Sequence, residues 1–262
     1  MTNRRHNVPL VANVCTYPPR REAMIKMVNR IAPQVDTLNV VLNEYSSVPD
    51  ELLSISNVNP ILPFENMRDV GKFFPRSDDD CYVLLLDDDI IYPTDYAQQT
   101  LSRYQKLKAG NSFAGYHGSI YERTLMESLL GAVGMRKSNG NGSLYESRKV
   151  YFFKTALKKY VKVDQLGTGV MIAPQRLLPT YEYMRTSQKF CDVRLARWSF
   201  EQDIDLVTMP REGNWLNALR FEESIFEDFT KTNPANVAHE ISRFAFRRKN
   251  LGTIKELGKS HL

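Results

Sequence analysis

Short apolar runs alternate with helical patterns along the first half of the chain. The predicted strands are residues 8–14, 37–42, 58–62, 82–86 and 113–116. The run YVLLL at 82–86 is apolar throughout, as expected of a strand covered on both faces. Residues 18–31 carry apolar side chains at helical spacing behind two prolines. A second helix is expected from a cap at Thr94 to near Gly110.

The second half has a less regular pattern. Its predicted elements are strands at 150–153, 160–163, 170–173 and 206–209 and a helix at 192–200. Strands that alternate with helices predict a three-layer α/β/α domain with a mainly parallel central sheet. We expect this domain to span residues 1–242, followed by a basic C-terminal tail at 243–262. Ligands of such sheets gather at the carboxyl ends of the strands.

Charge and cysteine content narrow the class of protein. The 262 residues carry a formal net charge of +5 and an isoelectric point near 9.0, which favours anionic partners such as nucleotide phosphates or an acidic membrane surface. The basic residues are spread along the chain beside acidic clusters, so we expect no nucleic-acid partner. The three cysteines lack metal-ligand spacing. With no apolar run long enough to span a bilayer and no recognisable signal peptide, we expect a cytoplasmic protein.

The strongest chemical feature is Asp87-Asp88-Asp89, directly after the YVLLL run. Adjacent carboxylates at the end of a buried strand repel one another, so a nearby cation would stabilise them. In extended geometry Asp87 and Asp89 point to the same side. Carboxylate ligands suit Mg²⁺ or Mn²⁺, and such an ion can bridge the phosphates of a nucleoside diphosphate. The alternative is a solvated acidic turn before the next helix.

The segment LLLDDDIIYPTDY resembles the DxD region of the GT-A glycosyltransferases, especially the large inverting glycosyltransferase family 2. Further segments resemble other parts of this family in the same order along residues 8–220. They are VANVCTYPPRREAM, NVVLNEYSS, QLGTGVMIAP, CDVRLARWSF and PREGNWL. The resemblance implies a GT-A (nucleotide-diphospho-sugar transferase) fold. In this family an acidic residue usually faces the nucleotide base. This chain has Asn43 and Glu44 at that place, so the identity of the nucleotide base is left undetermined.

The resemblance also implies a general base at Asp192, which would take a proton from the acceptor hydroxyl. Asp192 equally fits a plain cap of the helix that follows it. Glu201 and Asp203 are alternative bases. His239 is a candidate third metal ligand beside Asp87 and Asp89, by analogy with a C-terminal histidine of some relatives.

Several other side chains are candidates for donor binding. Lys72 could offset charge on the leaving diphosphate, and Arg21, together with Arg20, could meet phosphate. Tyr17 could stack on the base. Asn43 and Asp88 complete the expected donor site. Each of these residues also has an ordinary structural interpretation, as a surface cation or as part of the core.

A second group is expected near the transferred sugar or the acceptor. The Gly167-Thr168-Gly169 turn could let a ligand approach the backbone closely. His117 follows the fifth strand, and Trp215 could form a sugar platform. The competing interpretation of both aromatic residues is packing in the core.

The sequence as a whole favours a metal-dependent glycosyltransferase that uses Mn²⁺ or Mg²⁺ and a nucleotide-diphosphate sugar, with UDP as the expected nucleotide. The expected acceptor is a saccharide or glycolipid in polysaccharide or glycolipid synthesis. The tail mixes cations with apolar residues and could make a peripheral contact with the inner face of a membrane. A retaining GT-A enzyme and a metal-dependent nucleotidyltransferase remain alternatives, because both also use paired aspartates.

Overall fold

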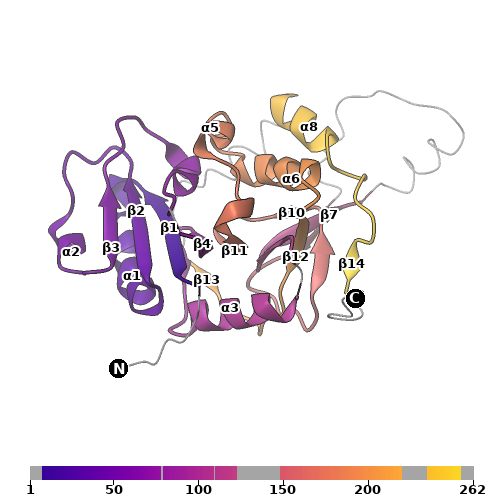
Figure 1. Cartoon of the computed structure of the whole chain (residues 1–262), viewed down its shortest axis with the longest axis horizontal. Helices are drawn as coiled ribbons and strands as arrows, with labels where there is room; N and C mark the ends of the chain where they lie inside the picture. Colours follow the sequence, from indigo (N-terminus) through magenta and orange to yellow (C-terminus); the bar gives the residue numbers. More distant parts are fainter. Residues whose placement is uncertain (1–7, 78, 109, 123–147, 220–234, 255–262) are drawn as a thin grey trace, which may run out of the picture.

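The computed structural model describes residues 8–77, 79–108, 110–122, 148–219 and 235–254 (Figure 1). Its central feature is a sheet in the order β14-β9-β12-β6-β11-β4-β1-β2-β3. The bounds of these strands, in chain order, are β1 Leu10–Thr16, β2 Thr37–Leu42, β3 Val58–Ile61, β4 Tyr82–Leu86, β6 Ser112–Gly115, β9 Val161–Val163, β11 Val170–Pro174, β12 Asp205–Thr208 and β14 Gly252–Thr253.

The sheet is mixed, whereas the sequence pattern predicts a mainly parallel one. Parallel pairing joins β3, β2, β1 and β4, and also β6 to β12. Strand β11 runs antiparallel to both β4 and β6, and β9 runs antiparallel to β12 and β14. The alternating strand–helix pattern covers only the amino-terminal half, so it correctly predicts the parallel part and misses the antiparallel insertions.

Helices cover both faces of the sheet, which confirms the expected three-layer arrangement (Figure 1). One face packs on α1 and α3, and the other on η3, α6 and α8. Successive residues of β4 alternate between the two cores: Leu84 and Leu86 face α1 and α3, while Val83 and Leu85 face the opposite layer. This double burial explains why YVLLL carries no polar side chain.

The helices and the smaller elements follow the same chain order. The α-helices are α1 Arg21–Ile31, α2 Asp50–Leu53, α3 Tyr96–Lys106, α5 Tyr181–Met184, α6 Cys191–Glu201 and α8 Ala235–Ser242. The 3₁₀ helices are η1 Pro18–Arg20, η2 Ala32–Gln34, η3 Arg68–Phe73 and η4 Gln175–Leu177. Two small sheets pair β10 (Gln165–Leu166), β7 (Gly118–Tyr121) and β8 (Arg148–Tyr151), and β13 (Asn217–Ala218) with β5 (Ile90–Ile91). In the part of the chain that the structure describes, no helix has both the length and the apolar character needed to cross a bilayer.

Most predicted boundaries shift by one to four residues, and two of the differences concern a helix cap and the start of the tail. Helix α3 has Asp95, not Thr94, at its N-cap, and the Asp95 side chain makes no capping hydrogen bond. The expected tail does not begin as a separate segment, because Phe244 is fully buried in the core that contains α6 and α8. Strand β14 also extends the central sheet by pairing with β9. Residues 243–254 therefore pack on the domain, and residues 255–262 lie outside the described residues.

Candidate functional site

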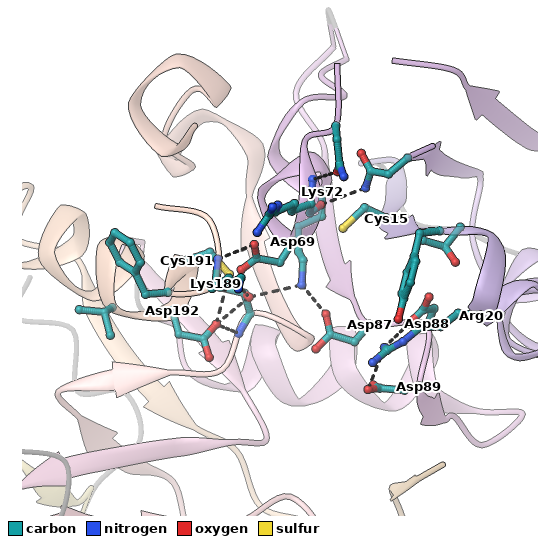
Figure 2. Close-up of a pocket in the computed structure, with 18 of the residues that line it drawn as sticks. Cys15, Arg20, Asp69, Lys72, Asp87, Asp88, Asp89, Lys189, Cys191 and Asp192 are labelled. Carbon is teal, nitrogen blue, oxygen red and sulfur yellow. Dashed lines mark hydrogen bonds and ion pairs between the residues drawn. The ribbon is translucent and has the colours of Figure 1, made fainter. Parts of the chain in front are cut away.

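A cavity of about 500 Å³ lies where β1, β2 and β4 end, at the carboxyl edge that the parallel topology predicts (Figure 2). Asp87, Asp88 and Asp89 lie on one side of it and Asp192 on the other, with Lys72 reaching between them (Figure 2). The remaining lining residues are Cys15, Thr16, Tyr17, Arg20, Asn43, Glu44, Asn66, Arg68, Asp69, Arg148, Gln165, Thr168, Lys189, Phe190, Cys191 and Val193.

Asp87 is fixed by the strand that precedes it and by the neighbouring Gly169. The Asp87 N–H donates to the Gly169 carbonyl at 3.1 Å, and the Tyr92 hydroxyl donates to the same carbonyl at 2.8 Å. A Cβ on Gly169 would lie 1.8 Å from Asp87 Oδ2. The Asp87 side chain therefore occupies the space that only a glycine leaves open, and its carboxylate forms an ion pair with Lys72.

Asp88 and Asp89 share one cation, Arg20. Its Nη1 lies 2.7 Å from Asp88 Oδ1 and 3.1 Å from Asp89 Oδ2. Burial raises the pKa of Asp88, although Arg20 acts in the opposite direction. Burial and the neighbouring Asp87 raise the pKa of Asp89 to about 6. The charged form of Asp89 is thus disfavoured mainly by burial, and a further cation bound beside it would stabilise that form.

Lys72 is a buried cation, with 2% of its surface exposed. Burial disfavours its charge, but Asp87 and the neighbouring Cys191 and Cys15 act in the opposite direction, and together they raise the pKa of Lys72. Its helix η3 is held against the sheet by Asn13, whose amide donates to the Lys72 carbonyl at 3.1 Å. Asn13 accepts in turn from Asn39 on the next strand at 2.8 Å. Two asparagines inside otherwise apolar strands are the sequence signal for this anchor, and the sequence prediction did not use it.

Asp192 lies in the first turn of α6, but it does not cap that helix. The N-cap residue is Phe190, which makes no side-chain capping bond. The carboxylate instead accepts two hydrogen bonds at Oδ1 from Thr168, one from the N–H at 2.8 Å and one from the hydroxyl at 2.7 Å. These contacts hold Asp192 at the cavity wall and argue against the plain capping interpretation of this residue.

The cavity wall formed by the residues after β2, at the start of η3 and before α6 has an unusual backbone. Glu44, Arg68 and Lys189 all line the cavity and all have left-handed φ values, of 61°, 49° and 73°. Such conformations are costly for residues with a side chain and persist where the surroundings hold them in place. Asn43 provides one such restraint, because it donates to the Arg68 carbonyl and accepts from the Met67 N–H. The Asn43 amide therefore braces this wall.

Three predicted site residues lie elsewhere. Arg21 is exposed and pairs with Glu51, so it does not line the cavity. His239 is exposed on α8 and is not among the residues that line the cavity beside Asp87 and Asp89. Trp215 stacks on Tyr96 at a centroid distance of 5.7 Å and packs into the core, which favours its structural interpretation. Position in a helix and charge, which are what the sequence shows, do not tell whether such side chains lie at the cavity or on another face of the molecule.

His117 and Gly167 are not among the residues that line the cavity, and they pack on each other. Burial lowers the pKa of His117 to about 4. A Cβ on Gly167 would lie 3.2 Å from the His117 side chain. Gly167 thus packs on His117 and Gly169 packs on Asp87, so the turn lies between these two side chains. Tyr17 lines the cavity and is half-buried, with Arg20 5.7 Å from the centre of its ring.

The alternative bases Glu201 and Asp203 also lie away from the cavity lining. Glu201 forms an ion pair with Arg197 at the end of α6, and Asp203 follows that helix. The sequence prediction missed Asp69 and Cys191, which line the cavity between Lys72 and Asp192. Burial raises the pKa values of both side chains. Asp69 lies outside the segments that resemble the family, and Cys191 is in one of them only as the neighbour of Asp192, so the fold reveals the position of both side chains.

The donor set fits a divalent cation that shares its coordination with a ligand. Of the Asp87 and Asp89 side chains, 43% and 29% are exposed. Mg²⁺ is usually held by one or two carboxylates together with substrate phosphates. Among the described residues, no group of three or more His, Cys, Asp and Glu side chains could hold a metal ion on its own. Water or phosphate oxygens would therefore have to complete the coordination.

Comparison with known proteins supports the fold. Neither a protein-family model nor a curated protein sequence matches the chain. A solved structure described as "Crystal Structure of a Mycobacterial Protein" aligns with a TM-score of 0.50 over 91% of this chain and 75% of its own chain. The two sequences are 13% identical, so the likeness concerns the α/β architecture alone.

Proposed function

We propose that the protein is a metal-dependent glycosyltransferase with a GT-A fold that uses a nucleotide-diphosphate sugar, with UDP as the expected nucleotide. One observation carries the proposal: Asp87–Asp89 and Asp192 face the same cavity at the carboxyl edge of the sheet. The first group supplies candidate metal ligands for a diphosphate. The second supplies a carboxylate that can accept a proton on the opposite side.

The donor side follows from charge. Mn²⁺ or Mg²⁺ would be held by Asp87 and Asp89 together with the two phosphates, where it would stabilise the negative charge that develops on the leaving group. Lys72 and Arg20 already lie against these carboxylates and add positive charge next to the same place. Tyr17 offers a half-buried aromatic side chain at the cavity wall for the base.

The acceptor side follows from Asp192. The acceptor hydroxyl oxygen forms a bond to the anomeric carbon while the bond from that carbon to the diphosphate oxygen breaks. Asp192 takes the hydroxyl proton, and the nucleoside diphosphate leaves with the electron pair of the broken bond. A base on the face opposite the leaving group corresponds to an inverting reaction. The expected acceptor is a saccharide or glycolipid, and the expected location is the cytoplasm or the inner face of a membrane.

The test begins with a panel of nucleotide sugars screened for Mn²⁺-dependent transfer or hydrolysis and for thermal stabilisation. The donor identified there is then compared across Asp89→Asn, Asp192→Asn and the control Asp79→Asn. Asp79 is exposed and is not among the cavity-lining residues. Asp79→Asn therefore removes one negative charge from the protein, as the other two variants do, but at a position outside the cavity.

Asp89→Asn should lose Mn²⁺-dependent nucleotide binding. Asp192→Asn should bind the donor normally and lose about 10²- to 10⁴-fold in transfer rate, the usual effect of removing a general base. Wild-type nucleotide affinity in Asp89→Asn would refute the donor-site assignment. Release of pyrophosphate instead of a nucleoside diphosphate would identify a nucleotidyltransferase, and retention of anomeric configuration would identify a retaining enzyme.

A further inference from the structure

Thr168 has contacts that the proposed reaction does not by itself require. It lies at the centre of the Gly167–Gly169 turn with 2% of its surface exposed. Both of its hydrogen-bond donors are directed at the same atom, Asp192 Oδ1, at 2.8 Å and 2.7 Å. The other carboxylate oxygen, Oδ2, takes no part in these two bonds.

Asp192 sets the direction of the hydroxyl bond, because a carboxylate oxygen only accepts. Lys72 Nζ lies 3.5 Å from Thr168 Oγ1. An ammonium group only donates, so in this contact Oγ1 accepts. Cys191 Sγ also lies 3.3 Å from Oγ1, and the single hydroxyl proton of Thr168 is directed at the Asp192 carboxylate at 2.7 Å. The chain of contacts runs from Asp87 through Lys72 and Thr168 to Asp192.

The turn itself is held on both sides. The Gly167 N–H donates to the His117 carbonyl at 2.9 Å, and the Gly169 carbonyl accepts from the Asp87 N–H at 3.1 Å. The threonine side chain is β-branched, which restricts its χ1 angle. The position of the Thr168 hydroxyl is therefore determined by the backbone, by Lys72 and by its own rotamer preference.

We propose that Thr168 is the positioning residue of Asp192: it holds Oδ1 and thereby directs Oδ2 toward the acceptor hydroxyl. This inference rests on the proposed glycosyl transfer. Thr168 does not receive the proton and does not bind the donor; it fixes the orientation in which Asp192 receives the proton. The effect of losing it should therefore appear in the rate of transfer rather than in donor affinity.

The kinetic test uses Thr168→Val, which keeps the shape and removes the hydroxyl, and Thr168→Ser, which restores it. Thr168→Val should lower kcat by about 10- to 100-fold, the usual effect of losing one hydrogen bond to a charged group. The KM for the donor and the affinity for UDP with Mn²⁺ should stay within about twofold. Thr168→Ser should recover most of the lost rate. Thr100→Val is the matched control, because Thr100 is also fully buried and bonded through its hydroxyl but lies on α3, away from the cavity.

A second measurement does not depend on turnover. The Thr168 amide proton should shift upfield by a clear margin in the NMR spectrum of Asp192→Ala, because its carboxylate acceptor is removed. If no nucleotide sugar is turned over but this shift is seen, the proposed function fails while the Thr168–Asp192 contact stands. An unmoved amide proton overturns the inference. Unchanged kcat in Thr168→Val also overturns it, as does a loss that serine fails to restore and that appears equally in donor affinity.

Discussion

Gly169→Ala is a sharp test of the cavity geometry because the change adds a single methyl group beside Asp87. The added Cβ would lie 1.8 Å from Asp87 Oδ2, 2.2 Å from its Cγ and 2.9 Å from its Cβ. Turning the carboxylate away would relieve the first two contacts but not the third. The φ angle of Gly169 is not in the left-handed region, so the substitution strains no backbone angle of its own. The predicted effect therefore comes from the displacement of Asp87.

Two opposing effects set the magnitude for stability. Overpacking a filled site costs about 1–3 kcal/mol, while replacing glycine restricts the unfolded chain and recovers about 0.4–1 kcal/mol. The net loss should be roughly 0.5–2 kcal/mol, which lowers the melting temperature by about 2–4 °C for each kcal/mol. The affinity for UDP with Mn²⁺ should fall more steeply, by about 10- to 100-fold, as expected when the residue supporting a metal ligand is changed.

Gly110→Ala is the matched control, since a Cβ at Gly110 meets nothing within 4 Å. This variant should keep wild-type UDP affinity and should melt at the wild-type temperature or slightly above it. Calorimetry with UDP and Mn²⁺ and thermal unfolding by circular dichroism measure both quantities. If Gly169→Ala behaves like Gly110→Ala in the two assays, then Asp87 does not hold the metal-bound diphosphate in the conformation described.

Two further predictions concern stability. Burial raises the pKa of Asp164 from 3.8 to about 6, so the folded protein binds this proton more tightly than the unfolded chain does. The free energy of unfolding should fall as the pH rises through that interval, and Asp164→Asn should flatten the fall in denaturant titrations. A truncation after Ser242 removes the buried Phe244 and should lower the melting temperature and donor affinity together. A truncation after Ile254 keeps that packing, so it tests separately whether the end of the chain contributes to binding of anionic liposomes.

The sequence predicted the central parallel strands β2 and β4 well because most of their side chains are buried and apolar. The predicted bounds of β2 and β4 agree with the structure, and the carboxylates after β4 line the same cavity as Asp192. The antiparallel position of β11 could not be predicted. Its apolar pattern suits either strand direction, and its pairing with β4 and β6 depends on contacts far apart in the chain.

The partners of the carboxylates were harder to predict than the carboxylates themselves. Arg20 and Arg21 are adjacent and look equivalent in the sequence. The chain places Arg20 on Asp88 and Asp89, whereas Arg21 faces the opposite way onto Glu51. A difference of one residue at the start of a helix rotates the side chain by about 100° around the axis.

Carboxylate crowding is an argument for nearby positive charge, and it does not distinguish a metal ion from a basic side chain. In this protein Arg20 and Lys72 neutralise much of the charge of Asp87, Asp88 and Asp89. The case for a divalent cation therefore rests on what a diphosphate would add. The phosphates of a bound diphosphate would bring new negative charge next to Asp87 and Asp89 in a partly buried cavity. Arg20 and Lys72 are already paired with the three carboxylates, so little protein positive charge remains to offset the charge of the phosphates. On this reasoning Mn²⁺ alone should bind weakly, and Mn²⁺ and UDP should each strengthen the binding of the other.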